Sequence, residues 1–206
     1  MNMKTLAALA LSAVLMTSAS AQIITTTKGP KSDATNLKIH KLDLVLKILP
    51  LALKKEQYKD LLLAVAKARQ KERELLEKED ETLEQLDSKL TDSLDAALTK
   101  GAYPSPELVT EVSNKTRDSG LRRSFLMAQL TESIYKDLTQ SLNAGQIKVM
   151  AGSFDDRYID PSAKKGDLKD DLKVRFFITN VILDPYSFDI LGSLETAATA
   201  DTTKKG

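Results

Sequence analysis

One uninterrupted stretch, residues 51–100, carries apolar side chains at helical intervals. It contains neither Pro nor Gly, and most of its residues favour helix. Positions separated by three or four residues fall on one face of a helix, and they form the row Leu83, Leu86, Leu90, Leu94 and Ala97. A helix of this length is not stable through propensity alone. We therefore expect the row to pack against the next helix of the chain or against a second copy.

The first half of this stretch has a broader apolar face. Its members shift gradually around the helix: Leu61, Leu62, Val65, Ala68, Leu75, Leu76 and Glu79. Charged residues of both signs crowd residues 69–80, where i,i+3 and i,i+4 pairs can form. We interpret this crowding as a solvated helix face, since interleaved charges are typical of one.

The end of the long helix and the start of the next are marked by turn residues. Gly101 stops the helix, and Pro104 and Pro106 prevent it from resuming at once. Ser105 before Pro106 is a helix start, and apolar spacing extends the returning helix to about Ser141. Because the connection is short, the two helices must run antiparallel. The predicted fold is therefore all-α, a long antiparallel hairpin with short flanking helices.

The flanking segments also follow helical spacing. Residues 37–49 predict a short helix that Pro50 ends. Asn143 and Gln146 predict a capping box at the start of another helix. Residues 168–194 mix helical and strand signals, and the spacing within 168–176 together with the absence of a hairpin turn favours helix. We divide the chain into a hairpin domain, 37–150, and a helical extension, 151–195.

Both ends of the chain are predicted to lie outside these domains. Residues 1–21 combine an early Lys4, an apolar run and a small-residue cleavage site, which indicates a secretory signal peptide. The apolar run is too short to span a bilayer. Residues 22–36 are interpreted as a flexible leader and residues 196–206 as a polar tail. We therefore expect a periplasmic or secreted protein without a membrane span.

The composition narrows the possible functions. After loss of Lys4 the acids and bases balance at 29 each, so no net charge draws the chain to nucleic acid. The chain has no Cys and a single His, which leaves no evident nucleophile pattern or zinc ligand set. We expect no enzyme activity, no cofactor and no metal site, and we interpret His40 as a surface or half-buried imidazole.

Two short segments share a pattern at a helix start. Leu53 and Gln57 have the same spacing as Leu142 and Gln146, and each Gln precedes an apolar residue. The pattern resembles the L-T-x-x-Q motif family of periplasmic helical proteins, which includes Spy and CpxP. Lys54 and Asn143 stand where that motif has Thr, and Asn143 keeps its capping chemistry. The resemblance covers about residues 37–150.

That resemblance implies a small dimeric helical cradle, active as an ATP-independent chaperone or as a repressor of an envelope-stress sensor. In the chaperone reading, apolar side chains hold partly unfolded clients, and we nominate Leu62, Val65, Leu76 and Phe125. In the alternative reading, the chain is a structural or docking element. Its coiled-coil leucine row then serves self-association, as a homodimer, or binds a sensor partner.

Overall fold

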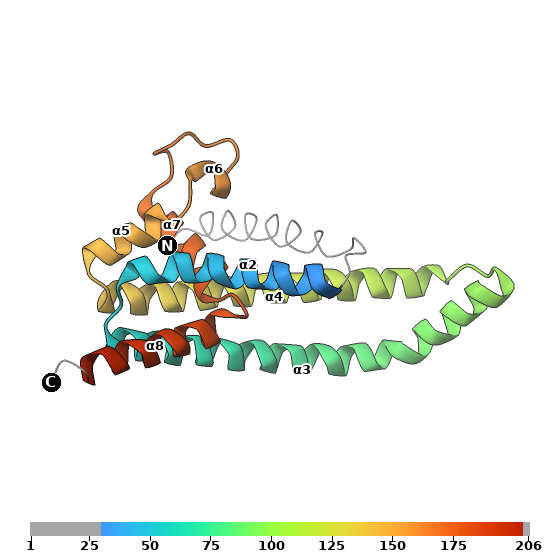
Figure 1. Ribbon diagram of the computed structural model, residues 1–206. Helices are drawn as coiled ribbons and strands as arrows, with labels where there is room; N and C mark the ends of the chain where they lie inside the picture. Colours follow the sequence, from blue (N-terminus) through green and yellow to red (C-terminus); the bar gives the residue numbers. More distant parts are fainter. Residues whose placement is uncertain (1–29, 204–206) are drawn as a thin grey trace. The chain divides into compact units, whose positions relative to one another are not determined.

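The structure is a computed structural model that describes residues 30–203. In these residues it is all-α, with seven α-helices and no strand (Figure 1). The order is α2 (Pro30–Ile48), η2 (Leu49–Leu51), α3 (Lys55–Lys100), α4 (Pro106–Ser141), α5 (Ala144–Gly152), α6 (Asp156–Ile159), α7 (Asp170–Phe177), η3 (Ile178–Ile182) and α8 (Ser187–Thr203). The predicted fold class is confirmed. The predicted signal peptide lies outside the described residues.

Helix α3 ends and helix α4 begins where the turn residues predict, whereas α3 begins at Lys55, four residues after the start of the predicted helical stretch. Gly101 adopts a left-handed backbone, φ 63°, directly after the last residue of α3. The Ser105 hydroxyl oxygen accepts from the backbone N–H of Leu108 at 3.2 Å, which caps α4 in front of Pro106. The predicted end of α3 and the predicted bounds of α4 are therefore confirmed.

Helix α2 is longer than the sequence predicted. It starts at Pro30, so the assignment of residues 30–36 to a flexible leader was wrong, whereas residues 22–29 lie outside the described residues. Pro is well suited to a first helical position, and Asp33 in the first turn favours the helix dipole. Pro50 ends α2 as predicted, and the chain continues through the short 3₁₀ turn η2.

The C-terminal segment is helical, as the spacing favoured. Helix α7 continues into η3, a π-helical turn in which the Leu183 N–H donates to the Ile178 carbonyl oxygen at 2.9 Å. Helix α8 extends to Thr203, so the assignment of residues 196–203 to a polar tail was wrong. Its apolar face, which buries Ile190 and Leu191, gives the helix a tertiary anchor that composition alone did not reveal.

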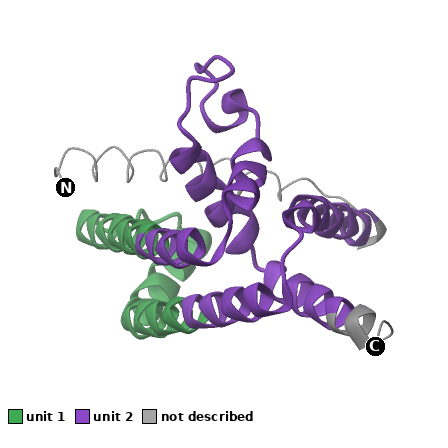
Figure 2. Cartoon of the chain, turned by 90° about the vertical axis from the view of Figure 1, so that its left-hand side faces the viewer, with its two compact units in different colours: residues 1–15, 69–128 green, residues 16–68, 129–206 purple. Residues whose placement is uncertain are grey.

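Two compact units divide the described chain (Figure 2). Residues 69–128 form unit 1, and residues 30–68 with 129–203 form unit 2, so α3 and α4 each contribute to both. These units cut across the predicted domain ranges 37–150 and 151–195. The largest fully buried side chains of unit 2 are apolar: Phe177, Leu44, Ile48, Leu51, Leu61, Met150, Ile178, Ile182, Leu191, Val65 and Val174. Unit 1 contributes one member to that class, Leu86.

Candidate binding surface

The two motif glutamines lie face to face within unit 2. The side-chain nitrogen of Gln57 donates to the side-chain oxygen of Gln146, and the reverse bond has the same length, 3.1 Å. We call this reciprocal amide pair the glutamine clasp. It connects the starts of α3 and α5, which are 89 residues apart in the sequence. The sequence predicted both motifs but not their contact.

The remaining polar groups of the clasp bond to backbone. The Gln57 oxygen accepts from the Lys54 N–H at 2.8 Å, and the Gln146 oxygen accepts from the Asn143 N–H at 3.0 Å. The Gln57 side-chain nitrogen also donates to the Ser141 carbonyl oxygen at 2.8 Å. The Gln146 side-chain nitrogen donates to the Leu51 carbonyl oxygen at 3.0 Å. A buried amide is tolerated only when it is satisfied in this way.

The two helix starts differ in their caps. The Asn143 side-chain oxygen accepts from the Gln146 N–H at 3.0 Å, which completes the predicted capping box. Lys54 has no side-chain acceptor for the equivalent bond. Leu53 and Leu142 precede the caps and are buried. The motif residues Leu53, Gln57, Leu142, Asn143 and Gln146 therefore support the fold. Leu53, Leu142 and Gln146 are buried, Gln57 is half-buried and Asn143 is exposed.

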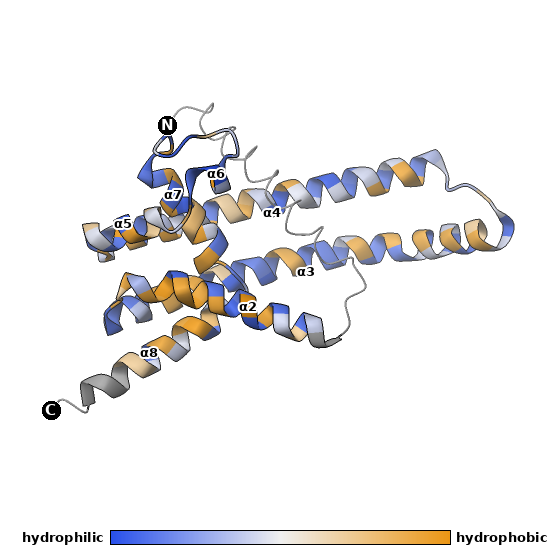
Figure 3. Cartoon of the chain, turned by 45° about the horizontal axis from the view of Figure 1, so that its top comes forward, coloured by the Kyte–Doolittle hydropathy of each residue, from blue (hydrophilic) through white to orange (hydrophobic). Residues whose placement is uncertain are grey.

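Unit 1 exposes a row of leucines on α3. The exposed fractions are 45% for Leu76, 51% for Leu83, 40% for Leu90, 59% for Leu94 and 76% for Leu98. Three further apolar side chains are exposed on α4: Val109, Leu121 and Phe125. In Figure 3 the hydrophobic turns of both helices alternate with hydrophilic ones. The row that the sequence assigned to packing is buried only at Leu86.

The four nominated client-binding residues have different surroundings. Leu76 and Phe125 lie in unit 1 and are exposed, whereas Leu62 lies in unit 2 and is half-buried. Val65 is 0% exposed, so it belongs to the core of unit 2 and its nomination for client contact was wrong. The periodicity placed Val65 on an apolar face correctly, but it did not reveal that this face is covered.

A second row of exposed apolar side chains, on α2 and the first residue of η2, was not predicted as a surface. It consists of Ile39, Leu42, Leu46 and Leu49, which are 49% to 61% exposed. Their spacing of three, four and three residues is the signal that could have found them. The sequence predicted a helix over residues 37–49 but assigned none of its faces. The structure buries Leu44 and Ile48 on the other side of the helix.

An ion pair crosses the interior of unit 1. Glu79 is 2% exposed, and one of its oxygens accepts from the Arg123 Nε–H at 2.7 Å. This bond is the main reason that the pKa of Arg123 is raised. The other Glu79 oxygen is buried and has no hydrogen-bond partner in the described part of the chain. The sequence placed Glu79 on the apolar face, which is the signal that could have revealed its burial.

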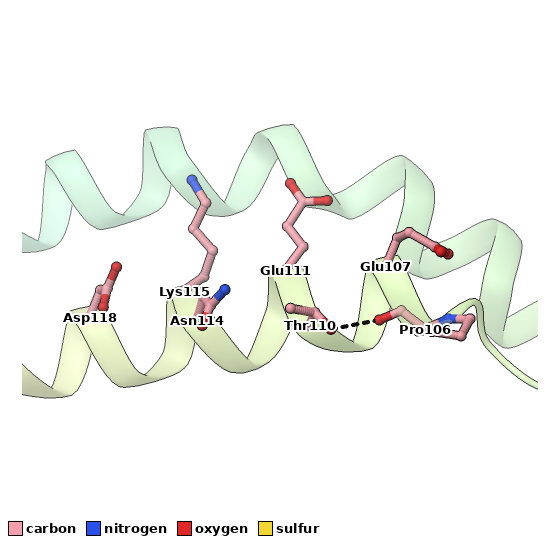
Figure 4. Close-up of a pocket in the computed structure, with 7 residues that line it drawn as sticks. All are labelled: Pro106, Glu107, Thr110, Glu111, Asn114, Lys115 and Asp118. Carbon is pink, nitrogen blue, oxygen red and sulfur yellow. Dashed lines mark hydrogen bonds between the residues drawn. The ribbon is translucent and has the colours of Figure 1, made fainter.

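Two grooves lie on the helices. In unit 1, an open groove of about 570 Å³ follows α4, and Figure 4 shows Glu107, Glu111 and Lys115 pointing from α4 toward the neighbouring helix. Glu111 accepts from Lys89 at 2.9 Å. In unit 2, a groove of about 330 Å³ has an apolar floor that includes Leu61 and Leu138. The unit 1 groove is charged and open, so it lacks the mostly apolar enclosure of a small-molecule site.

The charged clusters of unit 2 have structural partners. Asp156 accepts from the N–H groups of Gly166 and Leu168 at 2.6 and 3.2 Å and pairs with Lys173, whose hydrogen bond is the main reason that the pKa of Asp156 is lowered. His40, which is partly exposed, pairs with Asp184 at 2.8 Å. Among the described residues, no group of three acids or histidines gathers as metal ligands would. No helix within residues 30–203 is long and apolar enough to cross a membrane.

Comparisons with known proteins give no assignment. No family model, no curated protein and no solved structure matches this chain.

Proposed function

We propose that this chain is a non-enzymatic binding protein that holds apolar segments of partly unfolded proteins without using nucleotide. The observation that carries the proposal is the exposed leucine row of α3, with Leu121 and Phe125 exposed on α4 of the same unit. Large exposed apolar patches are costly in water and mark interaction sites. Interleaved charges keep such a surface soluble and speed the capture of clients.

The contrast between the two units supports this proposal. Unit 2 buries most of its large apolar side chains, so it can keep the chain folded while apolar residues of unit 1 remain in water. The two motifs that resemble the Spy and CpxP family fit this division, because in this chain their glutamines, Gln57 and Gln146, support the fold of unit 2. Export to the periplasm or cell exterior is part of the proposal, and it rests on residues 1–21.

The experiment is suppression of aggregation of a reduced, unfolding model protein by the purified chain, without ATP. The chain is expressed with its own N-terminal segment, so that intact mass shows whether it then begins at Gln22. We expect suppression near equimolar dose. Replacement of Leu83 and Leu90 by Gln should weaken suppression several-fold, whereas replacement of Ser88 and Thr99 by Gln, both exposed on the opposite face of α3, should not. No suppression at several-fold excess would contradict the proposal.

A second candidate function is self-association through the same row. Leu76, Leu83 and Leu90 are seven residues apart, which is the repeat of a coiled-coil seam. In that case the row is covered in solution by a second copy or by a sensor partner. Light scattering separates the two readings, because a dimer that becomes monomeric in the Leu83→Gln, Leu90→Gln variant, together with no suppression of aggregation, favours the docking element.

A further inference from the structure

The exposed leucine row of unit 1 has an acidic border. Between residues 77 and 98, α3 carries eight carboxylates and two lysines, a net charge of −6 in a chain whose total is close to neutral. A charge of this density on one helix segment creates a local field, although the whole protein has none at long range. The position of the charges relative to the leucines decides what this segment can bind.

Two aspartates lie directly beside the leucines. Asp80 is four residues after Leu76 and three before Leu83, and Asp87 has the same relation to Leu83 and Leu90. Residues three and four apart are neighbours on a helix surface, so the order along the row is Leu, Asp, Leu, Asp, Leu. Asp80 and Asp87 are both exposed.

More acids extend this border outward. Glu77 and Glu84 are within three or four residues of Asp80 or Asp87, and both are exposed. The two lysines lie elsewhere on the helix, because at 3.6 residues per turn Lys78 and Lys89 point away from Leu83 by more than a quarter turn. Lys89 instead pairs with Glu111. The exposed leucines therefore have carboxylates beside them on one side and no lysine among them.

This arrangement is unfavourable for the protein on its own. Like charges three or four residues apart destabilise a helix, and the border contains the pairs Glu77–Asp80, Asp80–Glu84 and Glu84–Asp87. Within the described residues none of these four acids is in an ion pair, although Asp80 lies close enough to Arg123 to contribute to its raised pKa. A cationic partner would relieve this repulsion, whereas an anionic one would add to it.

We propose that the row from Leu76 to Leu98, with its acidic border, is a docking surface for cationic amphipathic segments of other polypeptides. The proposal rests on the proposed function and names the class of client. Leucines bind the apolar face of such a segment, and the carboxylates pair with its Lys and Arg side chains. The row covers about 33 Å at 1.5 Å per residue, enough for a partner helix of about 20 residues.

The test measures binding of two synthetic peptides of about 20 residues by fluorescence anisotropy. Both have leucines at helical spacing, and their other positions are all Lys in one and all Glu in the other. We expect the Lys peptide to bind the full chain at least about tenfold tighter than the Glu peptide at about 50 mM salt, and this preference to shrink at about 500 mM salt, because salt screens exposed charges.

Two variants with the same loss of charge locate the site. Asp80→Asn with Asp87→Asn removes the border acids next to the leucines, and we expect several-fold weaker binding of the Lys peptide. Glu81→Gln with Asp92→Asn removes two exposed acids from the opposite face of the same helix and should leave binding within about twofold. All four positions are exposed, so circular dichroism should show unchanged folding of both variants.

Three results would overturn the proposal. One is equal binding of the two peptides, and another is an equal loss in both charge variants. The third is a dimer that dissociates in the Asp80→Asn, Asp87→Asn variant, which would assign the surface to a second copy. Suppression of aggregation without preference for the Lys peptide would refute this inference and leave the proposed function standing. Preference for the Lys peptide without suppression of aggregation would support this inference and contradict the proposed function.

Discussion

The two units of this protein differ in the size of their apolar cores, although both expose some large apolar side chains. Unit 2 buries a set of large apolar side chains that includes Phe177, and the amide of its buried Gln146 is hydrogen-bonded in the glutamine clasp. Unit 1 buries Leu86 and the carboxylate of Glu79, and it leaves five leucines of α3 exposed. The difference teaches that one sequence pattern, apolar residues at helical spacing, builds a core in unit 2 and leaves a mostly exposed leucine row in unit 1.

The largest expected effect comes from a matched pair of core and surface substitutions. Phe177→Ala in unit 2 should lower the free energy of unfolding by about 3–5 kcal/mol, because it leaves a cavity where the side chain was 0% exposed. Leu83→Ala in unit 1 should change it by only about 0.5 kcal/mol, since Leu83 is half exposed. Urea denaturation measures both. Similar losses would show that unit 1 also depends on its leucines for folding.

The glutamine clasp should behave as one unit. Gln57→Ala or Gln146→Ala each leaves a partner amide and a backbone N–H without their bonds, a loss of about 1–3 kcal/mol. Because the two side chains bond to each other, the double variant should lose less than the sum of the single losses, with a coupling of about 0.5–3 kcal/mol. Strictly additive losses would mean that the two amides act independently in solution.

Removal of Arg123 from its pair with Glu79 in unit 1 should lower the free energy of unfolding by less than the changes in unit 2. Arg123→Met leaves the buried Glu79 carboxylate without its partner, and because Arg123 is itself largely exposed we expect a loss of about 1–2 kcal/mol. The neighbouring Arg122→Met is the matched control and should be close to neutral. Addition of Glu79→Leu to Arg123→Met should recover stability, since replacing both charges removes the uncompensated one.

The smallest expected change concerns pH. The pKa of Asp156 is lowered mainly by the hydrogen bond from Lys173, so the folded state binds its proton more weakly than the unfolded state does. The Asp156 carboxylate therefore adds its full stability at a pH above its pKa in the unfolded state. This contribution is lost as the pH falls from that value through the lower pKa of the folded state. Denaturation between about pH 5 and pH 2 should show a weaker pH dependence in Asp156→Asn than in the unchanged chain.

The sequence by itself determined the local structure, because the signals for it are local. Gly101 and Pro106 mark the end of α3 and the start of α4, and Asn143 with Gln146 predicted a capping box whose bonds span three residues. Helical spacing also predicted the C-terminal helices against a competing strand signal. These features depend on backbone geometry within one or two turns, and no distant residue is needed to read them.

Only the tertiary structure decided which apolar faces are covered. Spacing placed Val65 and Leu83 on apolar faces alike, yet Val65 is 0% exposed and Leu83 is 51% exposed. The contact between Gln57 and Gln146, the burial of Glu79 and the helical ends beyond the predicted leader and tail also required the fold. The physical reason is that a helical period fixes the direction of a side chain from its own axis, whereas burial depends on what packs against that side.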